Sequence, residues 1–496
     1  MLYQSTRGGG AKVTASKAIA QGLAGDGGLF VPESFPVIPL DQIIELSKKP
    51  YKERAAYTIG LFLDDFSREE IGAYTDLAYG APGFDHPSIA PLYELDAKTH
   101  FLELWHGPTC AFKDMALQML PHLLVASLKK TREYREVCIL VATSGDTGKA
   151  ALEGFRDVPG TKVHVFYPRD GVSEVQKIQM VSQEGGNVNV TAVEGNFDDT
   201  QAGVKAIFSD EALRGQLSES GFLLSSANSI NWGRLVPQIA YYISAYCDLI
   251  SGGGATPGEN VDFCVPTGNF GNILAAYYAK KIGLPIGRLI CASNRNDVLA
   301  QFITTGKYDT NRPFFTTVSP SMDILVSSNL ERLLFEISRK DGRVVSDLMS
   351  ELSGSGRYEV SAQARAEIGK VFSGARCSEE ETMVTIREVF DTYGYLIDTH
   401  TAVAYKALCD HRAASGEDNT TVVVSTASPF KFCESVIGSL GRPSTYGGAE
   451  LIEELQELTG ASAPAPLRSL KGRLPRFVES VPVDGMKDAV MRFLEK

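Results

Sequence analysis

From about residue 90 onward, short runs of valine, isoleucine and leucine alternate with stretches that have helical periodicity. This alternation is typical of βαβ units, so it predicts an α/β fold built on parallel sheets. We expect strands at residues 137–142, 162–167, 187–193, 222–225, 262–266, 288–292 and 421–425.

Two of the expected strands are followed by glycine-rich loops that lead into helices. The first loop is Thr143-Ser-Gly-Asp-Thr-Gly148 and the second is Thr267-Gly-Asn-Phe-Gly-Asn272. Loops at the carboxyl ends of parallel strands face the crevice where doubly wound sheets bind ligands. The similarity of the two loops predicts two related doubly wound domains with a site between them.

The remaining patterns divide the chain further. Helices are expected at residues 15–21, 40–47, 51–63 and 68–79, ahead of the α/β pattern, and these suggest a separate N-terminal module. The expected divisions are the N-terminal module at 1–88, a first α/β domain at 89–235, a second at 236–440 with a mostly helical, charge-rich insertion at 328–395, and a C-terminal tail at 441–496 that ends in a helix at 485–495.

Charge and cysteine usage exclude several classes of function. The net charge of −12 argues against nucleic acid or an anionic membrane surface as a partner. No apolar run approaches the roughly 18 residues that a membrane span needs, and no segment resembles a signal peptide. The eight cysteines and seven histidines show neither a disulfide framework nor metal-ligand spacing. We therefore expect a cytoplasmic protein without a metal site.

Lys113 stands where a Gly-Pro turn becomes an apolar-periodic helix, within His106-Gly-Pro-Thr-Cys-Ala-Phe-Lys-Asp114. The dipole and the unpaired N–H groups at a helix start oppose a cation, and the neighbouring side chains are apolar. Both effects should favour the neutral amine, which is the form that attacks an aldehyde. The alternative is an ordinary lysine that extends along the surface.

This run resembles the cofactor-lysine motif of threonine synthases, which reads His-Gly-Pro-Thr-x-Ala-Phe-Lys-Asp. These are pyridoxal-phosphate enzymes of fold type II, related to the tryptophan synthase β subunit. The elements Ser5-Thr-Arg-Gly8 and Asp26-Gly-Gly-Leu29 are similar to the start of bacterial and fungal threonine synthases, which lack an N-terminal regulatory domain. The resemblance covers nearly the whole chain. It implies conversion of O-phospho-L-homoserine and water to L-threonine and phosphate.

The resemblance implies that Lys113 is the catalytic residue and binds pyridoxal 5'-phosphate. On the residues alone, the second glycine-rich loop could gather backbone N–H groups around an anion, or it could be only a turn. Thr426 lies in Ser425-Thr-Ala-Ser-Pro-Phe-Lys-Phe432 and matches the family residue whose hydroxyl meets the pyridine nitrogen; Ser428 replaces the usual histidine. The loop matches the family's phosphate-binding sequence, so the implied phosphate ligands are Gly268, Asn269, Phe270, Gly271 and Asn272.

Two further segments are implied to bind the substrate. Ser144, Gly145 and Thr147 match the loop that binds the substrate carboxylate in related enzymes. Asp146 is expected to accept a proton-bearing group, such as the cofactor's phenolic oxygen or the substrate amine; alternatively, it caps the following helix. A guanidinium suits bidentate phosphate recognition. The implied ligands of the substrate phosphate are Asn228, Ser229, Asn231 and Arg234.

Some alternatives stay open at this stage. Arg7 could reach an active-site phosphate, although we expect it to brace the chain, and His400 could lie near the site or be purely structural. A phospho-lyase or a serine/threonine dehydratase-like enzyme could share these motifs. A binding relative without catalytic activity is the alternative of another class. A monomer or a small homo-oligomer is expected.

Overall fold

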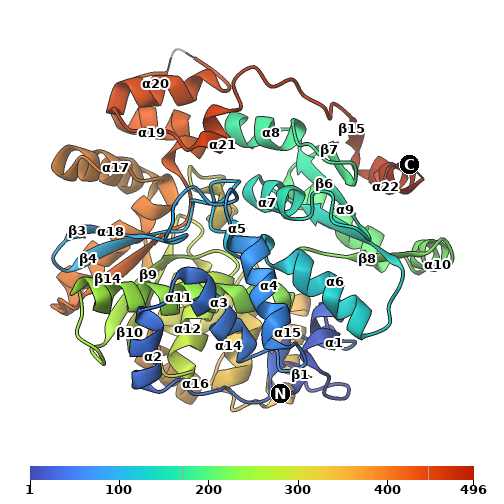
Figure 1. Cartoon of the computed structure of the whole chain (residues 1–496), viewed down its shortest axis with the longest axis horizontal. Helices are drawn as coiled ribbons and strands as arrows, with labels where there is room; N and C mark the ends of the chain where they lie inside the picture. Colours follow the sequence, from blue (N-terminus) through green and yellow to red (C-terminus); the bar gives the residue numbers. More distant parts are fainter. Residues whose placement is uncertain (171, 445, 496) are drawn as a thin grey trace.

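The computed structural model describes residues 1–170, 172–444 and 446–495 (Figure 1). Gly171, Thr445 and Lys496 belong to the expected first α/β domain and C-terminal tail, and they lie outside the described residues. Two sheets dominate the fold, the larger at the left of Figure 1 and the smaller at the right, with the helix after Lys113 between them. The expected α/β fold is therefore confirmed.

The larger sheet has the strand order β13-β10-β9-β14-β4-β3, and its pairs are parallel except for the β3–β4 hairpin. Its central strands β9 and β14 are buried along their whole length, which explains their almost continuous apolar sequences. The strands are β3 (Leu92–Asp96), β4 (Thr99–Glu103), β9 (Val261–Pro266), β10 (Ile286–Ser293), β13 (Phe372–Arg376) and β14 (Thr421–Ser425).

The smaller sheet is wholly parallel and has the order β15-β7-β6-β5-β8. All seven expected strands occur in the two sheets, each within two residues of its expected ends. The strands of this sheet are β5 (Glu136–Ala142), β6 (Thr161–Pro168), β7 (Val188–Glu194), β8 (Phe222–Ser225) and β15 (Ser480–Pro482).

The sheets divide the chain differently from the expected boundaries. Strands β3 and β4 fall within 89–235 but belong to the larger sheet, and β15 brings the C-terminal tail into the smaller one. Strand β13 lies inside the insertion that was expected to be mostly helical. Strands β4, β13 and β15 pair with partners that are distant in sequence, so only tertiary pairing places them in a sheet, and β3 follows through its hairpin with β4.

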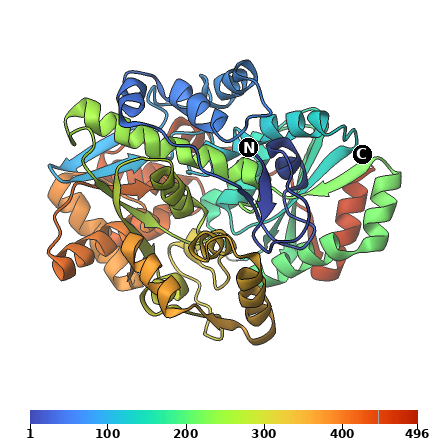
Figure 2. The ribbon, with the colours of Figure 1, turned by 90° about the horizontal axis from the view of Figure 1, so that it is seen from below.

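The N-terminal module packs against α11 (Trp232–Gly252), a helix buried on nearly every side (Figure 2). Helix α4 begins with a capping box, in which Ser67 and Glu70 satisfy each other's backbone N–H groups. Three of the module's helices match the expected ranges. The module contains β1 (Tyr3–Ser5), α1 (Ala15–Gln21), β2 (Phe30–Pro32), α2 (Leu40–Ser47), α3 (Tyr51–Gly60) and α4 (Arg68–Tyr79).

Helices cover both sheets, and the insertion adds the short hairpin β11 (Lys307–Asp309) and β12 (Arg357–Glu359). Among the described residues, no helix combines the length and the apolar character needed to cross a membrane. The other helices are α5 (Asp114–Leu117), α6 (Leu120–Lys130), α7 (Asp146–Gly154), α8 (Glu174–Val181), α9 (Phe197–Ser209), α10 (Glu211–Glu219), α12 (Gly271–Lys281), α13 (Val298–Thr305), α14 (Leu330–Ile337), α15 (Gly342–Ser355), α16 (Ala362–Val371), α17 (Glu379–Tyr393), α18 (Thr399–Ser415), α19 (Cys433–Ser439), α20 (Glu450–Thr459), α21 (Ala465–Arg468) and α22 (Met486–Leu494).

Candidate active site

The lysine motif is held against the end of β14. Ala111 and Ala427 form an antiparallel bridge, and the Phe112 N–H donates to the Thr426 carbonyl at 2.8 Å. This pairing sets Lys113 at the start of α5, next to Thr426. The apolar period predicted one continuous helix here, but α5 ends at Leu117 and α6 begins at Leu120. Pro121 explains the break, because it has no N–H to donate and its ring would collide with the carbonyl four residues earlier.

The amine of Lys113 is buried among polar groups. Its Nζ lies 3.4 Å from Asp146 Oδ2 and 3.3 Å from Ser321 Oγ. Burial lowers the pKa of Lys113, an effect that Asp146 opposes and that the nearby cations Arg234 and Lys431 reinforce. The direction agrees with the sequence argument, although the chief cause is burial and not the helix dipole.

Asp146 is the first residue of α7, and several side chains donate hydrogen bonds to its carboxylate or pair with it. Gln176 Nε2 donates to Asp146 Oδ1 at 2.7 Å, and Lys431 Nζ lies 2.9 Å from the same oxygen. Although burial opposes it, the ammonium groups of Lys431 and Lys113 hold the pKa of Asp146 well below its usual range. The carboxylate is therefore ionised and already bonded, and it does not cap α7, because the N-cap residue is Gly145.

The first glycine-rich loop, expected to bind a carboxylate, is tightly constrained. Gly145 has φ of 139°, and a Cβ at this position would lie 2.6 Å from the Gln176 side chain, so only glycine fits. The Thr143 hydroxyl accepts from the N–H groups of Gly145 and Gly148, which holds the turn closed. Ser144 and Thr147 are half-buried on the same turn.

The second loop joins β9 to α12 and has the form of an anion cup. Phe270 adopts a left-handed conformation with φ of 61° ahead of the first helical residue, Gly271. The hydroxyls of Tyr241 and Tyr242 donate to Asn272 Oδ1 at 2.5 and 2.6 Å, so the Nδ2 of Asn272 can only face away as a donor. Within the described residues this Nδ2 is buried and has no partner. A helix start with a spare amide donor fits a phosphate.

A third segment presents Arg234 from the first turn of α11. The Arg234 side chain is buried, its Nη1 donates to the Ala227 carbonyl, and its Nε has no partner among the described residues. Burial lowers the pKa of Arg234 to about 10. A buried guanidinium with a free edge is suited to an anionic ligand.

The neighbours of Arg234 have different positions. Asn231 Oδ1 accepts from the Gly233 N–H, and its Nδ2 donates to the Ile19 carbonyl, so the protein itself uses both ends of this amide. In this structure Asn231 caps α11. Ser229 Oγ accepts from Asn329 Nδ2 at 3.0 Å, and Asn228 is half-buried beside it.

Sequence reasoning missed two side chains that contact the catalytic groups. Lys431 is fully buried and donates to the Thr109 carbonyl at 2.7 Å while it pairs with Asp146; its place after the strand at 421–425 was the available signal. Ser321 carries no such signal. Arg7 forms a two-point ion pair with Glu331, which confirms the expectation that it braces the chain.

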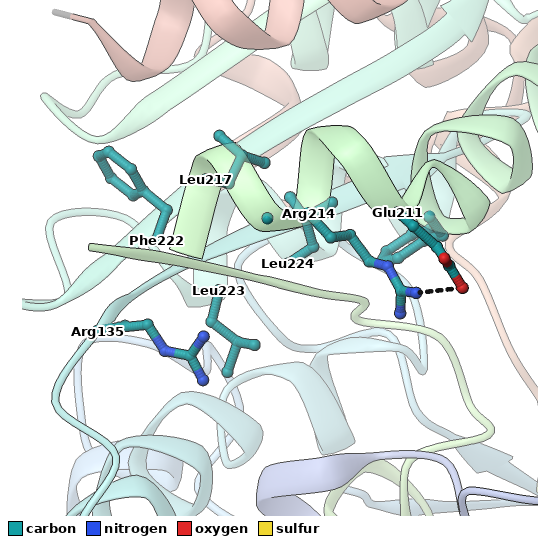
Figure 3. A pocket seen from close by; sticks show the side chains of 9 residues that line it. Arg135, Glu211, Arg214, Leu217, Phe222, Leu223 and Leu224 are labelled. Carbon is teal, nitrogen blue, oxygen red and sulfur yellow. Dashed lines mark ion pairs between the residues drawn. The ribbon is translucent and has the colours of Figure 1, made fainter. Parts of the chain in front are cut away.

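A cavity of about 400 Å³ lies elsewhere, at the outer edge of the smaller sheet (Figure 3). Strand β8 and helix α10 line it, with Arg135, Arg214 and Glu211 at its margin. It includes none of the residues around Lys113, and it lacks their buried charges. The candidate active site is therefore the one around Lys113.

Comparisons with known proteins agree with this geometry. The family profile described as "Pyridoxal-phosphate dependent enzyme" matches residues 82–427, "Threonine synthase N terminus" matches 2–79 and "Threonine synthase, C-terminal" matches 401–468. Threonine synthase from Pseudomonas aeruginosa is 41% identical over 88% of this chain and 90% of its own length. The chain belongs to the threonine synthase family.

Human threonine synthase-like 1 is 42% identical over 86% of this chain, and the match spans 58% of that longer protein. The solved structure of PLP-bound threonine synthase from Brucella melitensis covers 99% of both chains with 38% identity and a TM-score of 0.88. Like other members of the threonine synthase family, the protein is a pyridoxal-phosphate-dependent enzyme of fold type II. The free donors of the anion cup and the buried amine of Lys113 fit this cofactor.

Proposed function

We propose that this protein converts O-phospho-L-homoserine and water to L-threonine and phosphate. The observation that carries the proposal is that two donor groups, Asn272 Nδ2 and Arg234 Nε, have no partner within the described part of the chain and accompany one buried lysine amine. The substrate and the cofactor each carry one phosphate, so a site for both needs two anion-binding groups. Serine or threonine, the substrates of a dehydratase, carry no phosphate, so a dehydratase would need a phosphate-binding group for the cofactor alone.

Each segment has a definite task in this reaction. The bound pyridoxal phosphate supplies an electron-withdrawing ring that stabilises negative charge on the substrate carbons. Lys113 holds the cofactor covalently, and its freed amine moves protons at Cα, Cβ and Cγ of the substrate. Arg234, with Ser229 and Asn228, binds the substrate phosphate.

Other groups orient the ligands. The turn with Ser144, Gly145 and Thr147 binds the substrate carboxylate. Residues Gly268–Asn272 would hold the cofactor phosphate, and the Thr426 hydroxyl would face the ring nitrogen. A hydroxyl cannot keep that nitrogen protonated as a carboxylate would, so the buried cations around Asp146 supply part of the stabilisation.

Product analysis tests the proposal directly. The holoprotein incubated with O-phospho-L-homoserine should release threonine and phosphate in nearly equal amounts, with little 2-oxobutyrate. A predominance of 2-oxobutyrate would identify the phospho-lyase alternative, and release of neither product would favour a binding relative. Borohydride reduction followed by peptide mapping should place the cofactor on Lys113, and Lys113→Arg should abolish turnover because a guanidinium stays protonated.

Arg234→Ala tests the assignment of the substrate phosphate. It should lower kcat/KM for the phosphorylated substrate by roughly 100-fold or more, because it removes a desolvated charge partner. The absorption band of the bound cofactor should stay unchanged. Arg214→Ala, at the outer cavity, is the matched control and should leave kcat/KM unaltered. Equal effects of the two substitutions would contradict the assignment.

We also infer a cytoplasmic location and a monomer or small homo-oligomer. The support is that all eight cysteines are free thiols, seven of them buried, which suits a reducing compartment. Fractionation of the source cells tests the location, and light scattering of the purified protein tests the oligomeric state.

A further inference from the structure

Ser321 makes a different contact with each of its three polar groups. Its hydroxyl lies 3.3 Å from Lys113 Nζ and 3.2 Å from Asp146 Oδ2. Its backbone N–H donates to His400 Nε2 at 3.1 Å. Its carbonyl oxygen lies 2.8 Å from the point where a Cβ on Gly268 would stand. One residue therefore joins the lysine amine, a buried histidine and the anion cup.

The hydrogen bonds of His400 define which ring nitrogen carries the proton. Because His400 Nε2 accepts the N–H of Ser321, it carries no proton, and the ring proton sits on Nδ1, which lies 2.8 Å from Asp398 Oδ2. The Asp398 side chain also accepts from the first N–H groups of α18. Both side chains are almost fully buried. This pair anchors the backbone of Ser321 to the start of α18.

The rest of the Ser321 turn is equally constrained. The Asp323 carboxylate accepts from the N–H and the hydroxyl of Thr317 at 2.9 and 2.7 Å. The Ser327 hydroxyl donates to the Gly268 carbonyl at 2.9 Å, and the Asn329 N–H donates to the Asn269 carbonyl at 3.2 Å. The segment from Thr317 to Asn329 thus wraps the anion cup and holds the serine hydroxyl at a set position.

We propose that Ser321 is a positioning residue for the amine of Lys113. Its hydroxyl accepts an N–H of the amine and donates its own proton to Asp146, so the nitrogen is kept in place whenever the lysine is not bonded to the cofactor. The proton taken from the substrate Cα goes to Lys113 Nζ, and the serine hydroxyl gains and loses none. This inference rests on the proposed function for the substrate steps, but not for the attachment of the cofactor.

Ser321→Ala separates this role from a structural one, because alanine keeps the backbone contact with His400. The turnover number should fall about 100-fold, as misplacement of a reacting group by an ångström can cost that much, while KM changes little. The isotope effect with Cα-deuterated substrate should increase, since proton removal becomes slower relative to the other steps. Ser321→Thr, which keeps a hydroxyl, should restore most of the rate.

A second measurement does not depend on turnover. Pyridoxal phosphate is added to cofactor-free protein, and its covalent attachment is followed by absorbance. The attachment rate should fall roughly tenfold in Ser321→Ala, because the misplaced amine also reacts more slowly with the cofactor, although this effect is smaller than the effect on turnover. The final extent of binding should match the unaltered protein. Attachment and turnover rates within twofold of the unaltered protein would overturn the proposal. If attachment slows but the product is 2-oxobutyrate, the proposed function fails while the role of Ser321 stands.

Two substitutions of His400 test whether it anchors the backbone of Ser321. His400→Gln retains an acceptor for the Ser321 N–H and should keep the attachment rate within threefold, whereas His400→Leu removes the acceptor and should slow attachment about as much as Ser321→Ala. Loss of rate in both variants, or in neither, would exclude this anchoring contact.

Discussion

His106, the first residue of the lysine motif, lies between two carboxylates. Its Nδ1 is 2.7 Å from Asp85 Oδ1 and its Nε2 is 2.8 Å from Glu103 Oε2, so both nitrogens can donate at the same time only if the ring is protonated. Burial lowers the pKa of His106, but the hydrogen bonds to Asp85 and Glu103 outweigh it and raise the pKa from 6.5 to about 9. The charged ring thereby fixes the start of the turn that leads to Lys113.

This raised pKa predicts how stability depends on pH. Because the pKa of His106 is higher in the folded protein than in the unfolded chain, protonated His106 stabilises the fold. This stabilisation is complete below about pH 6.5 and is lost as the pH rises through about 9. The contribution is at most about 3 kcal/mol. His106→Gln should therefore lower the free energy of unfolding near pH 6 but much less near pH 9.5, as measured by urea denaturation. A difference that does not vary with pH would contradict this interpretation.

At the scale of an element, the anion cup and the Ser321 turn are packed backbone against backbone. A Cβ on Gly268 would lie 2.8 Å from the Ser321 carbonyl oxygen, whereas on Gly369 in α16 it would meet nothing within 4 Å. Gly268→Ala should weaken the binding of pyridoxal phosphate by roughly tenfold, which corresponds to about 1.4 kcal/mol. Titration of cofactor-free protein measures the change. Gly369→Ala is the control, and equal affinities would show that the turn can shift freely.

At the scale of the molecule, the C-terminal segment completes the smaller sheet. Strand β15 pairs with β7, and α22 packs against the same sheet in Figure 1. Phe493 of α22 is buried and meets the ring of His164 edge-on at 5.4 Å. Phe493→Ala should destabilise the fold by about 3–5 kcal/mol, whereas Leu474→Ala, at a residue 84% exposed, should change stability by less than about 0.5 kcal/mol. Urea denaturation followed by circular dichroism compares them, and similar midpoints would contradict this packing.

Local chemistry made much of this protein predictable. The buried strands have continuous apolar sequences, and α1, α2 and α4 have clear periods and boundaries, so their ranges follow from nearest neighbours in the chain. Loops at the carboxyl ends of parallel strands face a ligand-binding crevice, and the two similar glycine-rich loops follow β5 in the smaller sheet and β9 in the larger one, so their pattern predicted a site between two domains. The resemblance at Lys113 supplied the cofactor and the family.

Tertiary structure alone decided the rest. Strands β4, β13 and β15 pair with β14, β10 and β7, which lie far along the chain, so no local pattern could assign them to a sheet. Strand β3 joins the larger sheet only through its hairpin with β4. Ser321 and Lys431 reach Lys113 and Asp146 from segments about 200 to 300 residues away, and serine and lysine are ordinary surface residues when seen in sequence. The sequence by itself pointed to the candidate site residues, whereas the packing of the two sheets determined which groups hold them in place, because contacts between distant segments form only when their elements pack together.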